Sequence, residues 1–76
     1  MTDLLRAAGP RIFDMWQRGE LSLAAAQALL VEGKVWALDA AARMGRRQLR
    51  SLPGVGERRL AEIERAAERY GLLLAD

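Results

Sequence analysis

The sequence predicts an all-α fold, and three observations support this. Half of the 76 residues are hydrophobic (51%), and alanine and leucine supply most of them, whereas β-branched residues are few. Apolar residues recur at spacings of three and four along several stretches, which is typical of helices with one buried face. The seven glycines and two prolines fall between these stretches, where helices end. We therefore expect a compact five-helix domain.

One domain is expected to span residues 1–76, with an N-terminal helical extension over residues 1–19 and a core over residues 20–76. Within the extension, Thr2 or Asp3 can cap a short first helix. No apolar run reaches the length of a membrane span, and no basic leader with a cleavage site opens the chain. The expected location is the cytoplasm, with no membrane partner.

The second helix of the extension is expected over residues 11–18. It follows the Gly9-Pro10 break, because proline suits a first helical turn, and Gly19 ends it. Its large apolar side chains form either part of the core or an interaction face, and the core is favoured because so small a domain has little else to cover its helices. These side chains are Ile12, Phe13, Met15 and Trp16.

A third helix is expected from Ser22, whose hydroxyl can cap it, to about Val31. The Glu32-Gly33 pair ends this helix. Its inward positions are expected to be Leu23, Ala26 and Leu30.

A fourth helix is expected over residues 35–44, and Gly45 breaks the chain before a short helix over residues 46–51. Trp36 falls off the apolar stripe, so it either folds back over the N-terminal helices or stays partly exposed as a contact residue. The side chains expected to be buried are Val35, Leu38, Ala42, Leu49 and Leu52.

The last helix is expected to run from Glu57 to Gly71, followed by three leucines at 72–74 that fold back onto the core. Its inward positions follow the helical period. They are Leu60, Ile63, Ala67 and Tyr70. The charged positions expected to face solvent are Glu62, Glu64, Arg65, Glu68 and Arg69.

Residues 52–60 combine a helix stop, a tight turn and a helix start, and so predict a C-terminal helix-hairpin-helix. Pro53 has no N–H and fixes φ, which ends the preceding helix. Gly54 and Gly56 bracket Val55, which predicts positive φ at the glycines and room for another molecule to approach the backbone. Val55 is expected to be the apolar pin of the hairpin.

The start of the last helix is a candidate anion site. The first N–H groups of a helix have no internal partner, and the helix dipole is positive there. Six arginines against one acid lie between residues 43 and 59. A nucleic-acid phosphate is the expected anion; the alternative is a structural hairpin whose arginines keep the surface soluble. The residues expected to contact nucleic acid are Gly54, Val55, Gly56, Arg58, Arg59, Arg46, Arg47 and Arg50.

Catalysis is not expected. The chain lacks histidine and cysteine, which removes the commonest metal ligand, the commonest general acid or base, and any thiolate. Ser22 and Ser51 fit helix ends better than nucleophiles, and the acids are expected at solvent-facing positions. We expect neither an enzyme nor a metal site nor a cofactor.

The hairpin and last helix carry a glycine, a core leucine, an acid, an isoleucine and a closing glycine at Gly56, Leu60, Glu62, Ile63 and Gly71. In this order they resemble the C-terminal domain of the bacterial RNA polymerase alpha subunit. The similarity covers about residues 19–74, although the earlier helices match in spacing only. It implies a small helical module in transcription, because that family binds the minor groove of A·T-rich DNA upstream of promoters and docks transcription factors.

The resemblance carries over to individual residues in part. The family's contacts to the DNA backbone fall on Gly56 and Arg58, with its adjacent serine replaced by Arg59. Its groove-inserted arginine and the partner asparagine fall on alanine or glutamine, at Ala24 or Ala25 and at Gln27 or Ala28.

We therefore expect binding to the phosphate backbone of DNA with low sequence selectivity. The alternative is a protein adaptor or inhibitor that keeps the fold and binds RNA polymerase or another DNA-bound protein. The aromatic N-terminus and the missing groove reader favour that alternative. Either activity is compatible with a monomer or a homodimer.

Overall fold

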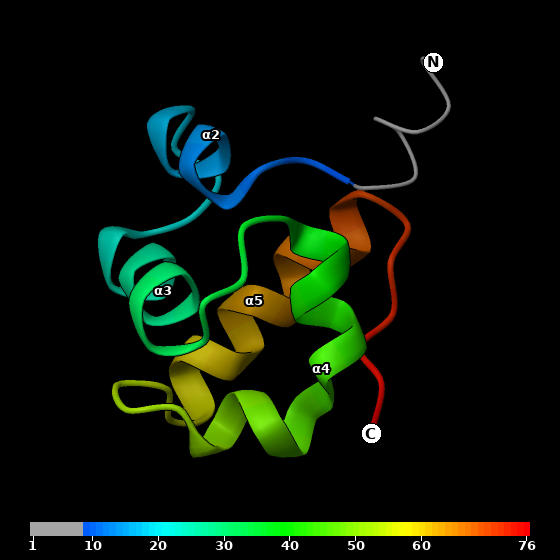
Figure 1. The fold of residues 1–76 in the computed structure, drawn as a ribbon. Coiled ribbons are helices and arrows are strands. Elements are labelled where there is room, and N and C mark those ends of the chain that lie inside the picture. The colour runs from blue at the N-terminus through cyan, green and yellow to red at the C-terminus, as the bar shows by residue number, and fades with distance from the viewer. Residues whose placement is uncertain (1–8) are drawn as a thin grey trace.

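The structure, a computed structural model, describes residues 9–76, which form four α-helices (Figure 1). These residues contain no β-strand, only an isolated antiparallel bridge between Arg11 and Ala37. The elements are α2 (Ile12–Gln17), α3 (Leu23–Gln27), its π-helical continuation η1 (Ala28–Glu32), α4 (Leu38–Ser51) and α5 (Glu57–Arg69). The all-α prediction is confirmed, although the described residues hold four helices and not five. The helix predicted to follow Thr2 or Asp3 lies outside them.

Glycines end α2 and α5 in the same way, as predicted. Gly71 has a φ of 74°, and its N–H donates to the Glu68 carbonyl at 3.0 Å, while the next N–H, of Leu72, donates to Ala67 at 2.9 Å. These two bonds satisfy carbonyls that the end of a helix leaves unpaired. Gly19, with a φ of 78°, closes α2 with the equivalent pair.

The prediction that the apolar side chains of α2 belong to the core is correct for two of the four and wrong for the other two. Ile12 and Met15 are fully buried, whereas Phe13 is 49% and Trp16 37% exposed. A helix of six residues can turn only one face toward the core, and the residues at positions 12 and 15 occupy it. Phe13 and Trp16 lie on the neighbouring face with ring centroids 5.6 Å apart.

Ser22 caps α3 as predicted, since its hydroxyl accepts the Ala25 N–H at 3.2 Å. The predicted inward face is wrong at Leu23, which is exposed. The buried positions are Ala25, Ala26, Ala28 and Leu29, which recur at the three- and four-residue spacing of a single helix face.

The fourth helix begins three residues later than predicted. Residues 36–38 instead run beside residues 10–12, where the Ile12 N–H donates to the Trp36 carbonyl and the Leu38 N–H to Pro10, both at 2.9 Å. These backbone groups therefore pair with another segment rather than with a helical turn. The Trp36 side chain is 69% exposed, which decides between the two alternatives for this residue.

Gly45 interrupts α4 as predicted, with φ 89° and ψ 166°. The two helical parts on either side form one element with a break. The tail also folds back as predicted, with Leu72 and Leu74 packed against the core, although Leu73 points into solvent.

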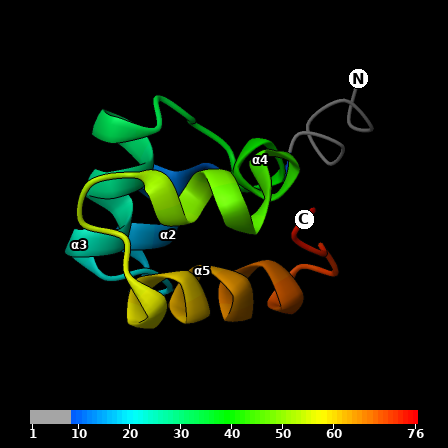
Figure 2. The same cartoon turned by 90° about the horizontal axis from the view of Figure 1, so that it is seen from below.

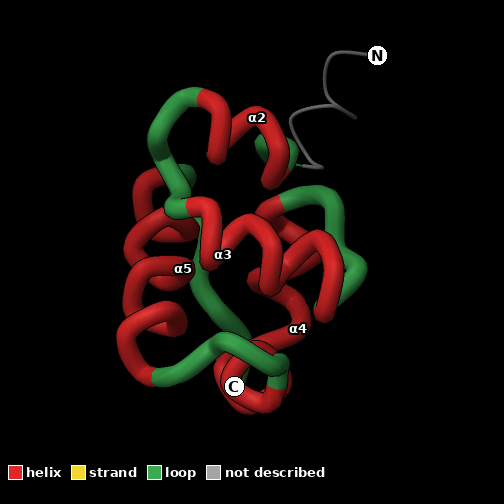
Figure 3. Tube along the Cα trace, turned by 90° about the vertical axis from the view of Figure 1, so that its left-hand side faces the viewer, coloured by secondary structure: helices red, strands yellow, loops and turns green. Residues whose placement is uncertain are grey.

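The core lies between α3, α4 and α5, and α2 closes one end of it (Figure 3). The second part of α4 runs beside α5 and joins it through a short turn (Figure 2). The radius of gyration of 11.2 Å matches the value of about 11 Å expected for a compact chain of this length. On α5, the predicted inward residues Leu60, Ile63 and Ala67 are buried, whereas Tyr70 is exposed.

Candidate nucleic-acid interface

The turn between α4 and α5 has the predicted shape at its first glycine. The Val55 N–H donates to the Leu52 carbonyl at 3.0 Å, and Gly54 takes a φ of 85°. Val55 is buried in the core cluster, so it does pin the turn. Gly54 is exposed, and a Cβ built on it would meet no atom within 4 Å.

The prediction of positive φ at Gly56 is wrong. Gly56 is the N-cap of α5 in extended backbone, with φ −102° and ψ −164°, a conformation open to any residue. It caps the helix in the usual geometry, with its carbonyl accepting the Leu60 N–H at 2.9 Å. Because glycine has no side chain, no side-chain acceptor caps the first N–H groups of α5.

The two arginines in the first turn of α5 have different surroundings. Arg59 donates to a Glu62 carboxylate oxygen at 3.0 Å and is only one-third exposed. Arg58 is exposed and makes no ion pair within residues 9–76. Of the two, Arg58 is the guanidinium that an incoming anion can reach without breaking a contact.

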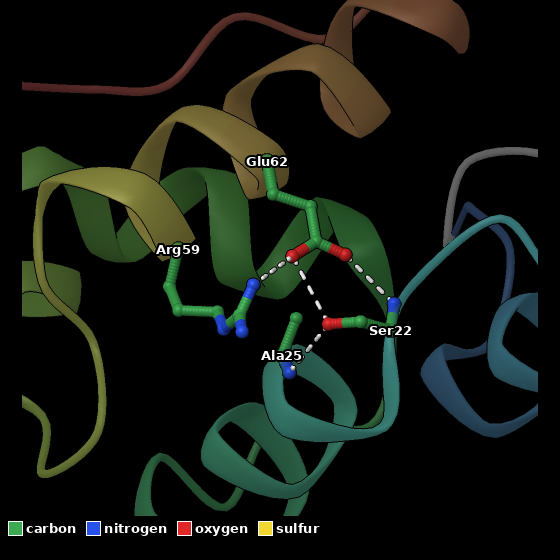
Figure 4. A network of polar contacts seen from close by, with 4 residues as sticks. All are labelled: Ser22, Ala25, Arg59 and Glu62. Carbon is green, nitrogen blue, oxygen red and sulfur yellow. Dashed lines mark hydrogen bonds and ion pairs between the residues drawn. The ribbon is translucent and has the colours of Figure 1, made fainter.

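Glu62 was predicted to face solvent, and this is wrong. Its two carboxylate oxygens accept the Ser22 N–H at 2.7 Å and the Ser22 hydroxyl at 3.0 Å (Figure 4). The Ser22 hydroxyl in turn accepts the Ala25 N–H, so Glu62 and Ser22 together cap α3. Arg59 completes this network, which joins the start of α3 to the first turns of α5. The sequence signals for this network are the capping serine at position 22 and the acid at position 62 in the family resemblance.

The three arginines predicted on α4 do lie together. Arg46, Arg47 and Arg50 line a groove of about 580 Å³ between the second part of α4 and α5. The groove is not uniformly basic, because three acids from α5 and the tail share it: Glu57, Glu64 and Asp76.

Ion pairs occupy two of these arginines. Arg46 pairs with Glu64 and, at 3.7 Å, with Asp76, while Arg50 pairs with Glu57. The arginine side chains remain about half exposed in these pairs. Within residues 9–76, Arg47 has no ion pair.

A second groove, of about 400 Å³, runs between α3 with η1 and the turn. It is lined by Ala24, Gln27, Ala28, Val31, Glu32, Pro53 and Gly54. The positions where the resemblance would place a groove-reading arginine and asparagine thus lie beside the turn but carry small or neutral side chains. This arrangement leaves the backbone of the turn accessible and supplies no cation on its α3 side.

A polar network ties the loop after α2 to the end of α5. The Tyr70 hydroxyl donates to Glu20, and Arg18 donates to Glu20 at 3.2 Å and to the Tyr70 oxygen at 3.3 Å. The hydrogen bond from Tyr70, followed by that from Arg18, lowers the pKa of Glu20 below its usual value. Because the network lies away from the turn and the arginine groove, it serves the fold rather than the candidate interface.

Within residues 9–76, no cluster of acids could hold a metal ion. No helix in that range has the length and apolar character needed to cross a membrane. Comparisons with protein-family models, with curated proteins and with solved structures found no match.

Proposed function

We propose that this protein binds the phosphate backbone of DNA through the turn at residues 52–56 and the first turn of α5. The observation that carries the proposal is the uncapped start of α5, where Gly54 and Gly56 have open space at their Cβ positions. Unpaired N–H groups at a helix start attract anions, and the absence of side chains on the two glycines lets a phosphate approach them.

In this proposal α4, the turn and α5 form a helix-hairpin-helix. The similarity to the C-terminal domain of the RNA polymerase alpha subunit supports a place in transcription. The groove beside the turn carries no cation, and Glu32 is its one charged side chain, so no basic group is positioned there to read bases and binding with low sequence selectivity is favoured.

The arginines contribute unequally to the proposed interface. Arg58 and Arg47 carry charges that no partner within residues 9–76 neutralises. Arg46 and Arg50 are in exposed ion pairs, which are worth only about 0.2–1 kcal/mol each, so a phosphate can replace the carboxylate at little cost. Arg59 donates to Glu62, which helps cap α3, and so contributes least to the proposed interface.

A salt titration tests the proposal. Binding of a fluorescent 20-base-pair duplex would be followed by anisotropy between roughly 50 and 200 mM salt, with the wild type and with Arg58→Ala. If Arg58 neutralises one phosphate, the slope of log affinity against log salt should fall by about 0.9 in the variant. Arg69→Ala is the matched control, because it removes the same charge from an exposed position at the other end of α5 and should leave the slope unchanged. Equal slopes in all three proteins would refute the phosphate site at the turn.

A second candidate function rests on a different observation. The exposed aromatic side chains of Phe13, Trp16 and Trp36 favour a protein partner, since aromatic residues dominate the energetic centres of protein interfaces. An absence of DNA binding by the wild type near roughly 50 mM salt would favour this candidate. Pull-down with RNA polymerase, comparing the wild type with Trp36→Ala, then tests whether the exposed Trp36 side chain contributes to binding the transcription machinery.

A further inference from the structure

Helix α4 is interrupted at Gly45, and the C-terminal tail packs against this break. At Gly45, φ 89° and ψ 166° lie in a region that only glycine occupies readily. In an uninterrupted α-helix, the Arg46 N–H would donate to the Ala42 carbonyl four residues earlier. That bond is replaced here.

Ala75 of the C-terminal tail takes the place of the missing bond. Its N–H donates to the Ala42 carbonyl at 3.0 Å, and its carbonyl accepts the Arg46 N–H at 2.8 Å. The tail passes so close to Gly45 that a Cβ there would lie 2.9 Å from the Ala75 carbonyl oxygen. One residue of the tail therefore satisfies two backbone groups that the break would otherwise leave unpaired, the Ala42 carbonyl and the Arg46 N–H.

Side chains on both sides of Ala75 hold the tail in place. Leu72 and Leu74 pack against the core, while Leu73 between them is exposed, so the segment alternates as an extended chain on an apolar surface does. Asp76 lies 3.7 Å from Arg46, on the second part of α4.

We propose that residues 72–76 act as a strap that holds α4 broken, and that α4 becomes continuous when the strap leaves. Without the strap, the Ala42 carbonyl and the Arg46 N–H lose their partners together. Rotation of Gly45 into helical backbone lets them pair with each other, and glycine can make that rotation. The rotation redirects residues 46–51, and with them the arginines of the groove. The strap and the break belong to the fold and do not depend on DNA binding at the turn.

Amide hydrogen exchange of the wild type, measured residue by residue by NMR, tests the strap without any substitution. If the strap leaves while α4 closes, the Ala75 amide should exchange at least tenfold faster than the Arg46 amide, because only Arg46 regains a partner. Urea at low concentration should accelerate the exchange of Ala75 less than that of Arg46, because release of the strap exposes less surface than the larger opening that Arg46 exchange requires. Equal rates with equal urea dependence, or faster exchange at Arg46, would show that the break and the strap open together and would overturn the proposal.

Gly45→Ala populates the continuous state directly. Alanine neither tolerates the backbone of the break nor fits beside the Ala75 carbonyl, so the Ala75 amide should lose its protection while Arg46 keeps it. Gly19→Ala is the control, because Gly19 also has positive φ but no neighbouring atom within 4 Å of its Cβ position, and the Ala75 amide should stay protected. If the Ala75 amide stays protected in Gly45→Ala, or if the Ala75 and Arg46 amides both lose protection, the proposal is contradicted. Should Gly45→Ala fail to fold, the wild-type comparison decides alone.

Discussion

Replacement of Gly56 by aspartate should raise the stability of the fold and weaken DNA binding at the same time. Gly56 is the N-cap of α5 in extended backbone, and its Cβ position has no atom within 4 Å. Aspartate therefore fits without strain, and its carboxylate can accept the N–H of Arg58 or Arg59. The same carboxylate would occupy the place proposed for a phosphate and repel it.

The expected gain in stability has three parts. A capping side chain adds a few tenths of a kcal/mol over glycine, a negative charge at the helix start about 0.3–1 kcal/mol, and loss of glycine's freedom in the unfolded chain about 0.4–1 kcal/mol. We take about 1 kcal/mol, the low end of the sum, because the neighbouring carboxylate of Glu57 opposes a second negative charge. For a domain of this length, the melting temperature should rise by about 4–8 °C.

Thermal melts followed by circular dichroism measure the stability of Gly56→Asp, and anisotropy with a duplex measures its affinity for DNA. We expect the affinity to fall about tenfold or more, the equivalent of about 1.4 kcal/mol. Gly54→Asp is the control for the stability effect: it adds the same charge within the proposed site and should also weaken DNA binding, but at a φ of 85° it should cost about 1 kcal/mol of stability and lower the melting temperature. A melting temperature that fails to rise refutes the cap geometry. A raised melting temperature with unchanged affinity refutes the phosphate site.

Three further predictions follow from the packing and the polar networks. Met15→Ala should lower the free energy of unfolding, measured in urea, by about 2–5 kcal/mol because Met15 is fully buried. Trp16→Ala should lower it less, because Trp16 is partly exposed. A larger loss for Trp16→Ala than for Met15→Ala would place the Trp16 side chain in the core. Ser22→Ala should cost at least about 1 kcal/mol, since it removes the cap of α3 and leaves the Glu62 carboxylate with one partner fewer; an unchanged urea midpoint would contradict this network. Glu20 has a lowered pKa, so its contribution to stability is present above pH 4.5 and is lost as the pH falls through the lowered value. Tyr70→Phe should flatten that acid dependence in urea melts between roughly pH 3 and 6, and an unchanged dependence would exclude Tyr70 as its main cause.

Sequence reasoning predicted the features that depend on a few neighbouring residues. Gly19 and Gly71 end helices, Gly45 breaks α4, Ser22 caps α3 and Pro53 follows the end of α4. Each of these depends on the conformations that one residue type permits, or on a side chain that reaches its own backbone. The apolar period of α5 also predicted its buried face, because that helix is long enough for one face to stand out.

Predictions that depended on the choice between similar faces or partners were less successful. On the short α2, apolar residues surround much of the helix, and only packing selected Ile12 and Met15 over Phe13 and Trp16. Residues 36–38 pair with residues 10–12 rather than start a helix, since a partner segment satisfies their backbone groups there. For Gly56, an N-cap geometry and a positive-φ turn are equally open to glycine, so its residue type could not distinguish them.

The sequence by itself determined where the helices end, that they form an all-α fold, and that arginines gather before and after the turn. Only the tertiary structure decided which charges remain available for a partner. Acids that are distant in the sequence come to lie beside the arginines: Glu64 and Asp76 at Arg46. Similarly, the Glu62 carboxylate on α5 does not face solvent but accepts hydrogen bonds from Ser22 at the start of α3. The C-terminal ends of the helices follow from backbone conformations that are local to the chain. The pairing of charges follows from the packing of helices, which brings together residues that no sequence spacing relates.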